Sequence, residues 1–191
     1  MSVTDLGINV DVIKLQPLSH SIWEQSDDWW NRDQKDFNKN VQRAVQMVPE
    51  HMFDSYMDSC GRIADLSHPE EAYTALTPDM IDSILPDILD EIPYTLVRGR
   101  WMLVNTQSSY TAHTDPSNRI HIPVLTSPNN QMLFYPNGLD ALQNDVQSYH
   151  MKEGSVYHAE TVKTHSFVNM SGYDPMQSFP YRIHLVFGIV E

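Results

Sequence analysis

Cysteine and long apolar runs are scarce in this sequence. The 191 residues include a single cysteine, Cys60, so no disulfide can form within the chain. A lone thiol is more typical of a reducing compartment than of a disulfide-stapled secreted scaffold, and we expect a cytoplasmic protein. Nothing near the amino terminus combines a basic start with an apolar run of signal-peptide length. No stretch approaches the roughly eighteen apolar residues that span a bilayer, so we expect no membrane partner.

Basic side chains are also scarce. The chain has 12 lysines and arginines against 25 aspartates and glutamates, which gives a formal net charge of −13 at pH 7. A protein of this charge repels polyanions. We therefore expect that nucleic acid is not the partner, and that most of the acidic side chains lie on solvated surfaces.

The sequence lacks a Gly/Ser-rich linker, an internal repeat or a low-complexity segment that would divide it. Its length fits a single domain, residues 1–191, with a helical support region over 1–93 and a β-rich core over 94–191. The support region is expected to hold a short β-type strand at residues 10–15 and helices at residues 21–37, 40–57 and 78–92. A helix start is also expected at residues 67–71, where Ser67 could be the N-cap.

The periodicity changes to two from about Tyr94 onward, and the segments become short and bounded by Asn, Pro, Gly and Ser. Eight strands are predicted, at residues 95–106, 109–115, 118–126, 131–135, 147–152, 155–160, 164–170 and 181–190. Eight strands at this spacing are typical of a double-sheet jelly roll, the cupin-like double-stranded β-helix. We expect a mainly β protein in which helices from the amino-terminal region pack on one of the two sheets.

Two of the predicted strands divide polar from apolar side chains in the same way. On one of them Arg119 and His121 alternate with aliphatic residues, and on the last strand Arg182 and His184 do so. Such strands can bury their apolar face under helices and turn the polar face into the lumen between the sheets. Arginine and histidine in a lumen are costly unless anions or metal ligands meet them, so the lumen is where we expect the chemistry.

His113-Thr114-Asp115 places an imidazole and a carboxylate on the same face of an extended segment. His165, in the penultimate predicted strand, is the natural third ligand. Two histidines and one carboxylate on one side of a metal leave coordination positions open, which is the arrangement of iron(II) oxygenases. The absence of a cysteine near these residues does not favour a structural zinc site.

Arg182 lies on the last predicted strand and offers a planar, permanently charged fork that suits bidentate contact with a carboxylate. The remote end of 2-oxoglutarate is such a group. The other end of this co-substrate, its second carboxylate and keto oxygen, would chelate iron(II) and leave a position for O2.

At these residues the sequence resembles the aspartyl/asparaginyl β-hydroxylase-like (prolyl hydroxylase-like) branch of the 2-oxoglutarate- and iron(II)-dependent dioxygenases. The matching runs are His113-Thr114-Asp115, Arg119-Ile120-His121-Ile122-Pro123-Val124-Leu125-Thr126, Glu153-Gly154-Ser155-Val156, His165-Ser166-Phe167-Val168-Asn169 and Arg182-Ile183-His184-Leu185-Val186-Phe187.

The resemblance implies a double-stranded β-helix with His113, Asp115 and His165 as metal ligands and catalytic residues. It also implies that Arg182 binds the distal carboxylate of 2-oxoglutarate, and that Arg119 and His121 approach its metal-proximal end. Asp115 stands where the namesake aspartyl hydroxylases lack a carboxylate ligand. The chain is therefore more similar to hydroxylases with a full triad.

The expected activity is hydroxylation of a C–H bond in an amino-acid residue or a small molecule, with 2-oxoglutarate converted to succinate and CO2. The partners would be 2-oxoglutarate and a peptidyl or small-molecule substrate. Two other readings stay open: a cupin-type metalloenzyme that does not use 2-oxoglutarate, and a non-catalytic jelly-roll binding module. Three details also stay open: His158 as a rival ligand, His184 as a packing or supporting residue, and residues 171–180 as a lid or a long turn.

Overall fold

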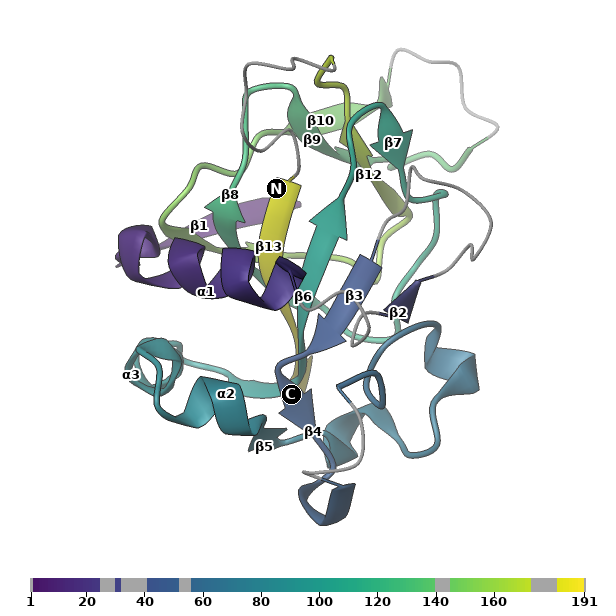
Figure 1. Ribbon diagram of the computed structural model, residues 1–191. Helices are drawn as coiled ribbons and strands as arrows, with labels where there is room; N and C mark the ends of the chain where they lie inside the picture. Colours follow the sequence, from purple (N-terminus) through teal and green to yellow (C-terminus); the bar gives the residue numbers. More distant parts are fainter. Residues whose placement is uncertain are drawn as a thin grey trace.

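The computed structural model describes residues 2–24, 30–31, 41–51, 56–139, 145–172 and 182–190, with backbone alone for 20–24, 30 and 31. Within these ranges the chain forms two main antiparallel sheets and a small two-stranded one (Figure 1). In spatial order, the larger sheet contains β1 (Val3–Asn9), β11 (Ser155–Ala159), β8 (Arg119–Leu125), β13 (Arg182–Val190), β6 (Thr95–Val104), β3 (Val41–Ala44) and β2 (Trp30–Asn31). The smaller sheet contains β10 (Gln147–Tyr149), β9 (Asn130–Phe134), β12 (His165–Asn169) and β7 (Ser108–Ser109).

The remaining elements are short apart from one helix. They are α1 (Val12–Glu24), α2 (Pro78–Ile81), α3 (Leu85–Asp90), the 3₁₀ turns η2 (Pro49–His51), η3 (Ile63–Asp65) and η4 (Glu70–Ala72), and the strand pair β4 (Gln46–Met47) and β5 (Ala75–Leu76). None of the helices in the described part of the chain is long and apolar enough to cross a membrane.

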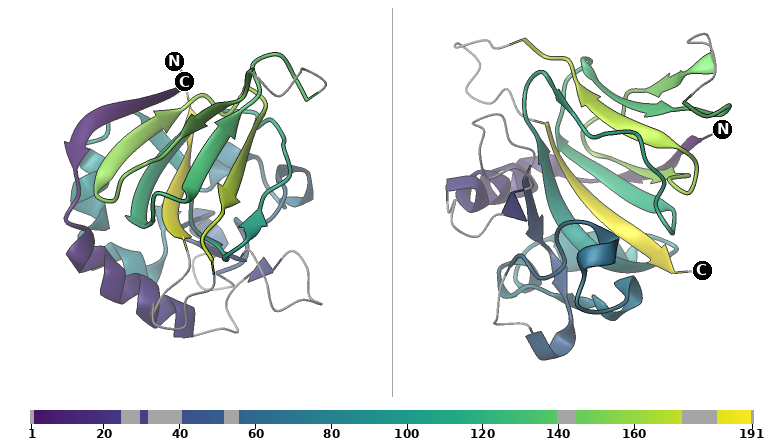
Figure 2. Two further views of the ribbon diagram at one scale, coloured as in Figure 1. Left: turned by 90° about the horizontal axis from the view of Figure 1, so that it is seen from above. Right: turned by 90° about the vertical axis from the view of Figure 1, so that its right-hand side faces the viewer.

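The eight strands from β6 to β13 form a jelly roll. Along the chain β6, β8, β11 and β13 belong to the larger sheet, whereas β7, β9, β10 and β12 belong to the smaller one, so the chain passes repeatedly between the two sheets. In the right-hand view of Figure 2, α1 lies on one side of the larger sheet and the smaller sheet lies on the other. Each of the eight predicted strands has a counterpart here, and the predicted mainly β, jelly-roll class is confirmed.

Strand alternation produces the main hydrophobic core. The apolar residues of β8 and β13, among them Ile122 and Leu185, form one buried cluster with Leu15 of α1, Met80 of α2 and Leu85 of α3. Each fully buried side chain of this size contributes roughly 1.5–3 kcal/mol relative to an exposed one. This burial fixes the register of the central strands, because a slip of one residue would turn their arginines and histidines into the core.

A smaller cluster lies on the other side of the larger sheet. It includes Met132 and Phe134 of β9, Phe167 of β12, and Tyr157 and Ala159 of β11. Because these residues come from both sheets, they close part of the space between the sheets. The rest of that space is polar and holds the candidate site.

The amino-terminal region differs from the prediction. The strand is β1 rather than residues 10–15, and α1 begins at Val12 inside the range that was expected to be extended. The predicted helix over 40–57 is wrong, because Val41–Ala44 forms β3, which pairs with β6 inside the larger sheet. All four residues of β3 are buried, so its sequence does not alternate and gives no period-two signal.

The other helix predictions are only partly right. The helix start expected at residues 67–71 leads only to the 3₁₀ turn η4. Of the residues predicted as a helix over 21–37, 21–24 belong to α1, Trp30–Asn31 form β2, and the others lie outside the described residues. The helix expected over 78–92 is instead the pair α2 and α3. Pro86, in the first turn of α3, lacks an N–H and would clash with the carbonyl four residues earlier, which prevents a continuous helix. Residues 1–93 therefore contribute more strand than expected.

Candidate metal centre

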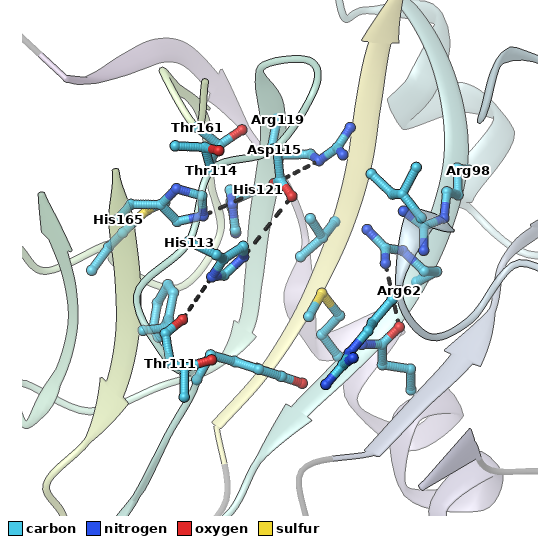
Figure 3. A pocket seen from close by; sticks show the side chains of 18 of the residues that line it. Arg62, Arg98, Thr111, His113, Thr114, Asp115, Arg119, His121, Thr161 and His165 are labelled. Carbon is cyan, nitrogen blue, oxygen red and sulfur yellow. Dashed lines mark hydrogen bonds and ion pairs between the residues drawn. The ribbon is translucent and has the colours of Figure 1, made fainter. Parts of the chain in front are cut away.

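The three residues predicted to bind metal lie together between the two sheets (Figure 3). His165 is the first residue of β12, and His113 lies in the segment that follows β7. An isolated antiparallel bridge holds these two residues opposite each other. The backbone nitrogen of each residue lies 2.9 Å from the carbonyl oxygen of the other. Asp115 is held nearby, because its backbone N–H donates to the carbonyl oxygen of Thr161 at 2.9 Å.

The side chains of the three residues converge. The Nε2 of His113 lies 3.9 Å from Oδ1 of Asp115, and the Nε2 of His165 lies 3.9 Å from Oδ2. One ligand atom from each residue can be chosen so that all three lie within 4.8 Å of one another. Two imidazole nitrogens and one carboxylate oxygen in this arrangement match the donor set of a non-haem iron(II) facial triad.

Both imidazoles are fixed in the tautomer that a metal requires. The Nδ1 of His113 lies 2.7 Å from the carbonyl oxygen of Thr111, and the Nδ1 of His165 lies 2.9 Å from that of Lys163. A carbonyl oxygen only accepts, so Nδ1 carries the proton in each ring and the lone pair is on Nε2. This is the outer support that metal-binding histidines usually have.

Asp115 is held by an arginine. The Nε of Arg119 donates to Oδ2 of Asp115 at 3.1 Å, while its Nη2 lies 2.9 Å from Oε1 of Glu70. Burial raises the pKa of the Asp115 carboxyl, but the nearby positive charge, above all that of Arg119, outweighs this effect and lowers the pKa below its usual value. The carboxylate is therefore ionised at neutral pH and ready to bind a cation.

Glu70 links two arginines to this site. Its Oε1 lies 3.2 Å from Nη1 of Arg98 as well as near Arg119, and its Oε2 accepts a hydrogen bond from Ser117 at 3.2 Å. Sequence reasoning missed Glu70, since it lies in η4, far from Arg119 along the chain. No local pattern marks a carboxylate of this kind.

The other predicted site residues face the same space. Arg182 lies 1% exposed at the start of β13, with its guanidinium carbon 3.1 Å from the centre of the Phe167 ring and Nη2 against Nδ1 of His184. His121 is also buried. Burial lowers the pKa of both histidines and of Arg182 well below the usual values, and the charge of Arg182 lowers the pKa of the two histidines further. His121 and His184 are therefore neutral.

Several buried polar atoms in this group have no hydrogen-bond partner within the described part of the chain. They are Nε of Arg182, Nε2 of His184 and both ring nitrogens of His121. Buried polar atoms without partners are costly, so their presence beside a cavity favours a binding site for a polar group there. Arg182 and His121 line that cavity, which has a volume of about 350 Å³.

The cavity has a second polar wall, opposite the metal ligands. It contains Arg98 and Arg100 of β6, with Arg62 just before η3 (Figure 3 labels Arg62 and Arg98). None of these three arginines was predicted to belong to the site, although Arg98 and Arg100 show the pattern that marked Arg119 and Arg182, namely arginine in an otherwise apolar strand.

Both arginines line the cavity, and they lie two residues apart in β6, as Arg119 and His121 do in β8. The strand is nevertheless irregular at this point. The register against β13 shifts between Val186 and Gly188, and Arg98 has a φ of 52°. Gly99 lies between them, and a Cβ at this position would overlap the ring of Phe187.

The residue left open as a rival ligand lies elsewhere. His158 in β11 pairs with Ile120, whose side chain belongs to the main hydrophobic core rather than to the lumen. The ring of His158 stacks on Tyr94, with the ring centroids 5.5 Å apart. It is not in the ligand cluster. Of residues 171–180, only 171 and 172 are described, so the expected lid or turn lies outside the described residues.

No protein-family model and no curated protein matches the sequence. Solved structures match the fold. A 2OG-Fe(II) oxygenase family oxidoreductase from Burkholderia pseudomallei superposes with a TM-score of 0.52 at 11% identity, over 98% of this chain and 84% of that one. A prolyl-4-hydroxylase from Pseudomonas putida gives 0.53 at 9% identity, over 100% and 94%. HygX from Streptomyces hygroscopicus, with nickel and 2-oxoglutarate bound, gives 0.52 at 9% identity, over 98% and 82%.

The chain thus has the fold of the 2OG-Fe(II) oxygenases and holds a His-Asp-His cluster in its lumen. At these identities the likeness shows the fold and does not extend to activity or to the aspartyl/asparaginyl hydroxylase branch.

Proposed function

We propose that this protein is a non-haem iron(II)- and 2-oxoglutarate-dependent dioxygenase that hydroxylates a C–H bond of an amino-acid residue or a small molecule, giving succinate and CO2. One observation carries the proposal. The Nε2 atoms of His113 and His165 and a carboxylate oxygen of Asp115 converge in the lumen, and each imidazole is held in the metal-binding tautomer by a backbone carbonyl.

Each residue has a role that follows from its contacts. His113, Asp115 and His165 would hold iron(II), and Arg119 positions the Asp115 carboxylate by donating to Oδ2. With O2, iron(II) and 2-oxoglutarate supply the oxidising chemistry. The protein supplies the orientation of the bound groups and a cavity shielded from water.

Arg182 is suited to hold the distal carboxylate of 2-oxoglutarate. Its buried guanidinium has no carboxylate partner in the described chain, and an incoming carboxylate would satisfy it with paired, charge-assisted hydrogen bonds. His121, neutral and without partners, is suited to a hydrogen bond with the metal-proximal end. The bound 2-oxoglutarate of HygX, which has the same fold, supports this assignment.

Anaerobic titration of the purified protein with iron(II) and 2-oxoglutarate tests the proposal. The chelate of these two groups gives a weak visible charge-transfer band, which we expect in the parent protein and in His158→Ala, a matched control away from the site. It should be absent in His113→Ala. Iron binding without a band would favour a cupin-type metalloenzyme, whereas the absence of both would favour a binding module.

A further inference from the structure

The cavity is strongly basic, although the protein is acidic. The chain has a net charge of −13 at pH 7. In contrast, five of the cavity-lining residues are arginines, Arg62, Arg98, Arg100, Arg119 and Arg182, and Asp115 is the sole carboxylate among the lining residues described. This concentration of positive charge exceeds what the metal ligands need.

Two of the five arginines already have carboxylate partners. Arg119 pairs with Asp115 and Glu70, and Arg98 pairs with Glu70 while donating to the carbonyl oxygens of Ser59 and Gly61. Under the proposed function, Arg182 takes the distal carboxylate of 2-oxoglutarate. Arg100 and Arg62 remain.

Arg100 is buried and has an incomplete set of partners. It is 6% exposed, and its Nη1 donates to Oε1 of Gln42 at 3.3 Å. Its Nε has no partner, and no carboxylate lies within 4.0 Å in the described chain. Burial, together with the charges of Arg98 and Arg119, lowers the pKa of Arg100 to about 9, so its guanidinium is still protonated at neutral pH.

The position of Arg100 is well defined by its neighbours. It lies in β6 between β3 and β13, opposite Ala44 on one side and Val186 on the other. Arg62, which is exposed, lies on the same wall of the cavity. One arginine is therefore deep and rigidly placed, and the other lies near solvent.

Cofactor binding would leave this positive charge in place. Iron(II) and doubly charged 2-oxoglutarate cancel each other, so they do not neutralise Arg100. A buried cation without a counter-ion is costly, and the cost is removed when an anion binds it with good geometry. The open Nε edge of a guanidinium fits the two oxygens of a carboxylate.

We propose that Arg100, assisted by Arg62 nearer to solvent, binds a carboxylate of the substrate and thereby holds the substrate across the cavity from the metal ligands. This inference rests on the proposed function, and it narrows the substrate class to carboxylate-bearing molecules. It also gives Arg182 and Arg100 different tasks, because Arg182 would bind the co-substrate and Arg100 would bind the substrate.

Calorimetric titration of the anaerobic protein, saturated with iron(II) and 2-oxoglutarate, tests this site. The probes are propionate, its uncharged analogue propionamide, and inorganic phosphate. We expect propionate to bind at least about tenfold more tightly than propionamide, the difference that a charge-assisted hydrogen bond gives. Equal binding of the two would overturn the proposal. Tighter binding of phosphate than of propionate would also contradict a carboxylate site.

Two variants locate the binding. Arg100→Gln should remove the preference for propionate. Gln42→Glu should do the same without emptying a buried site, since it places a nearly isosteric carboxylate beside Arg100. Gln131→Glu, the same chemical change on β9 outside the cavity lining, should keep the preference. A preference that survives in Gln42→Glu would contradict the proposal even if Arg100→Gln does not fold.

The visible band separates this inference from the proposed function. No band in the parent protein contradicts 2-oxoglutarate binding itself. A band without a propionate preference contradicts the Arg100 site alone. Loss of the band in Arg100→Gln but not in Arg182→Met would show that the two arginines have exchanged roles, and the assignment would be wrong.

Discussion

The two walls of the cavity differ in how completely their polar atoms are paired. On the metal-binding wall, the Nδ1 atoms of His113 and His165 have backbone partners, and Oδ2 of Asp115 has Arg119. On the opposite wall Arg100 keeps an open Nε, and so does Arg182 on the last strand. The first wall is complete apart from the atoms that face a metal, whereas the arginines still need anions. The difference suggests a rigid metal centre facing a receptive surface for co-substrate and substrate.

The largest effect should come from breaking the metal-binding wall. His165→Ala removes one of three ligands, and we expect iron(II) affinity to fall by more than about 100-fold, beyond the loss caused by removing a supporting residue. Anaerobic iron binding measured by elemental analysis after dialysis checks this. Folding should survive, since the variant keeps the backbone bridge to His113. Iron binding equal to that of the parent would place the metal elsewhere.

A smaller loss of binding affinity, this time for 2-oxoglutarate, should follow from changing the receptive surface. Arg182→Met keeps a long side chain against Phe167 but removes the charged fork. Leaving the buried carboxylate of 2-oxoglutarate unpaired should weaken its binding by roughly 100-fold, while iron affinity changes little. Titration of the visible band measures the affinity for 2-oxoglutarate, and elemental analysis measures the bound iron. Arg182→Lys should recover part of the loss, because it restores the charge without the planar fork.

Glu70→Gln tests the connection between the two walls. Glu70 holds both Arg98 and Arg119, and Arg119 in turn holds Asp115. Removing its charge should weaken iron(II) binding by about tenfold through the loosened Asp115, the range typical of outer-shell partners. The exposed Glu71→Gln provides a control with no expected change. An unchanged iron affinity in Glu70→Gln would show that Asp115 needs no support from Glu70.

The Glu70 carboxylate should also make the stability of the fold depend on pH in the acid range. Burial raises the pKa of Glu70, but Arg119 and Arg98 outweigh it and lower that pKa below 4.5. Its ionised form therefore stabilises the folded protein fully above about pH 4.5, and this contribution disappears as the pH falls through the folded-state pKa. We expect the difference in unfolding free energy between parent and Glu70→Gln, about 1–3 kcal/mol at neutral pH, to shrink on acidification. Urea unfolding of the metal-free proteins at several pH values measures it.

The jelly roll and the cluster of His113, Asp115 and His165 could be predicted from sequence because their signals are largely local. β8 and β13 each begin with alternating polar and apolar residues, and His113-Thr114-Asp115 places its imidazole and carboxylate on one face without any knowledge of distant residues. The distal ligand His165 required the strand pattern as well. Its predicted strand is β12.

What was missed depends on long-range contacts. β3 is buried on both faces, and it forms a strand because it pairs with β6. The local sequence of Val41–Ala44 does not show this pairing and predicts a helix instead. The ion pairs of Glu70 join an isolated 3₁₀ turn to two strands. The register shift in β6 likewise depends on a distant residue, because Phe187 packs where a side chain at Gly99 would lie.

The proposed metal and co-substrate site is tested most directly by a crystal structure of the protein, from crystals grown without oxygen in the presence of iron(II) and 2-oxoglutarate, with anomalous data collected at the iron edge. We predict one iron peak among His113, Asp115 and His165, and the distal carboxylate of 2-oxoglutarate on Arg182, with Arg100 free to bind a substrate. An iron peak at any other place, or 2-oxoglutarate bound through Arg100, would contradict it.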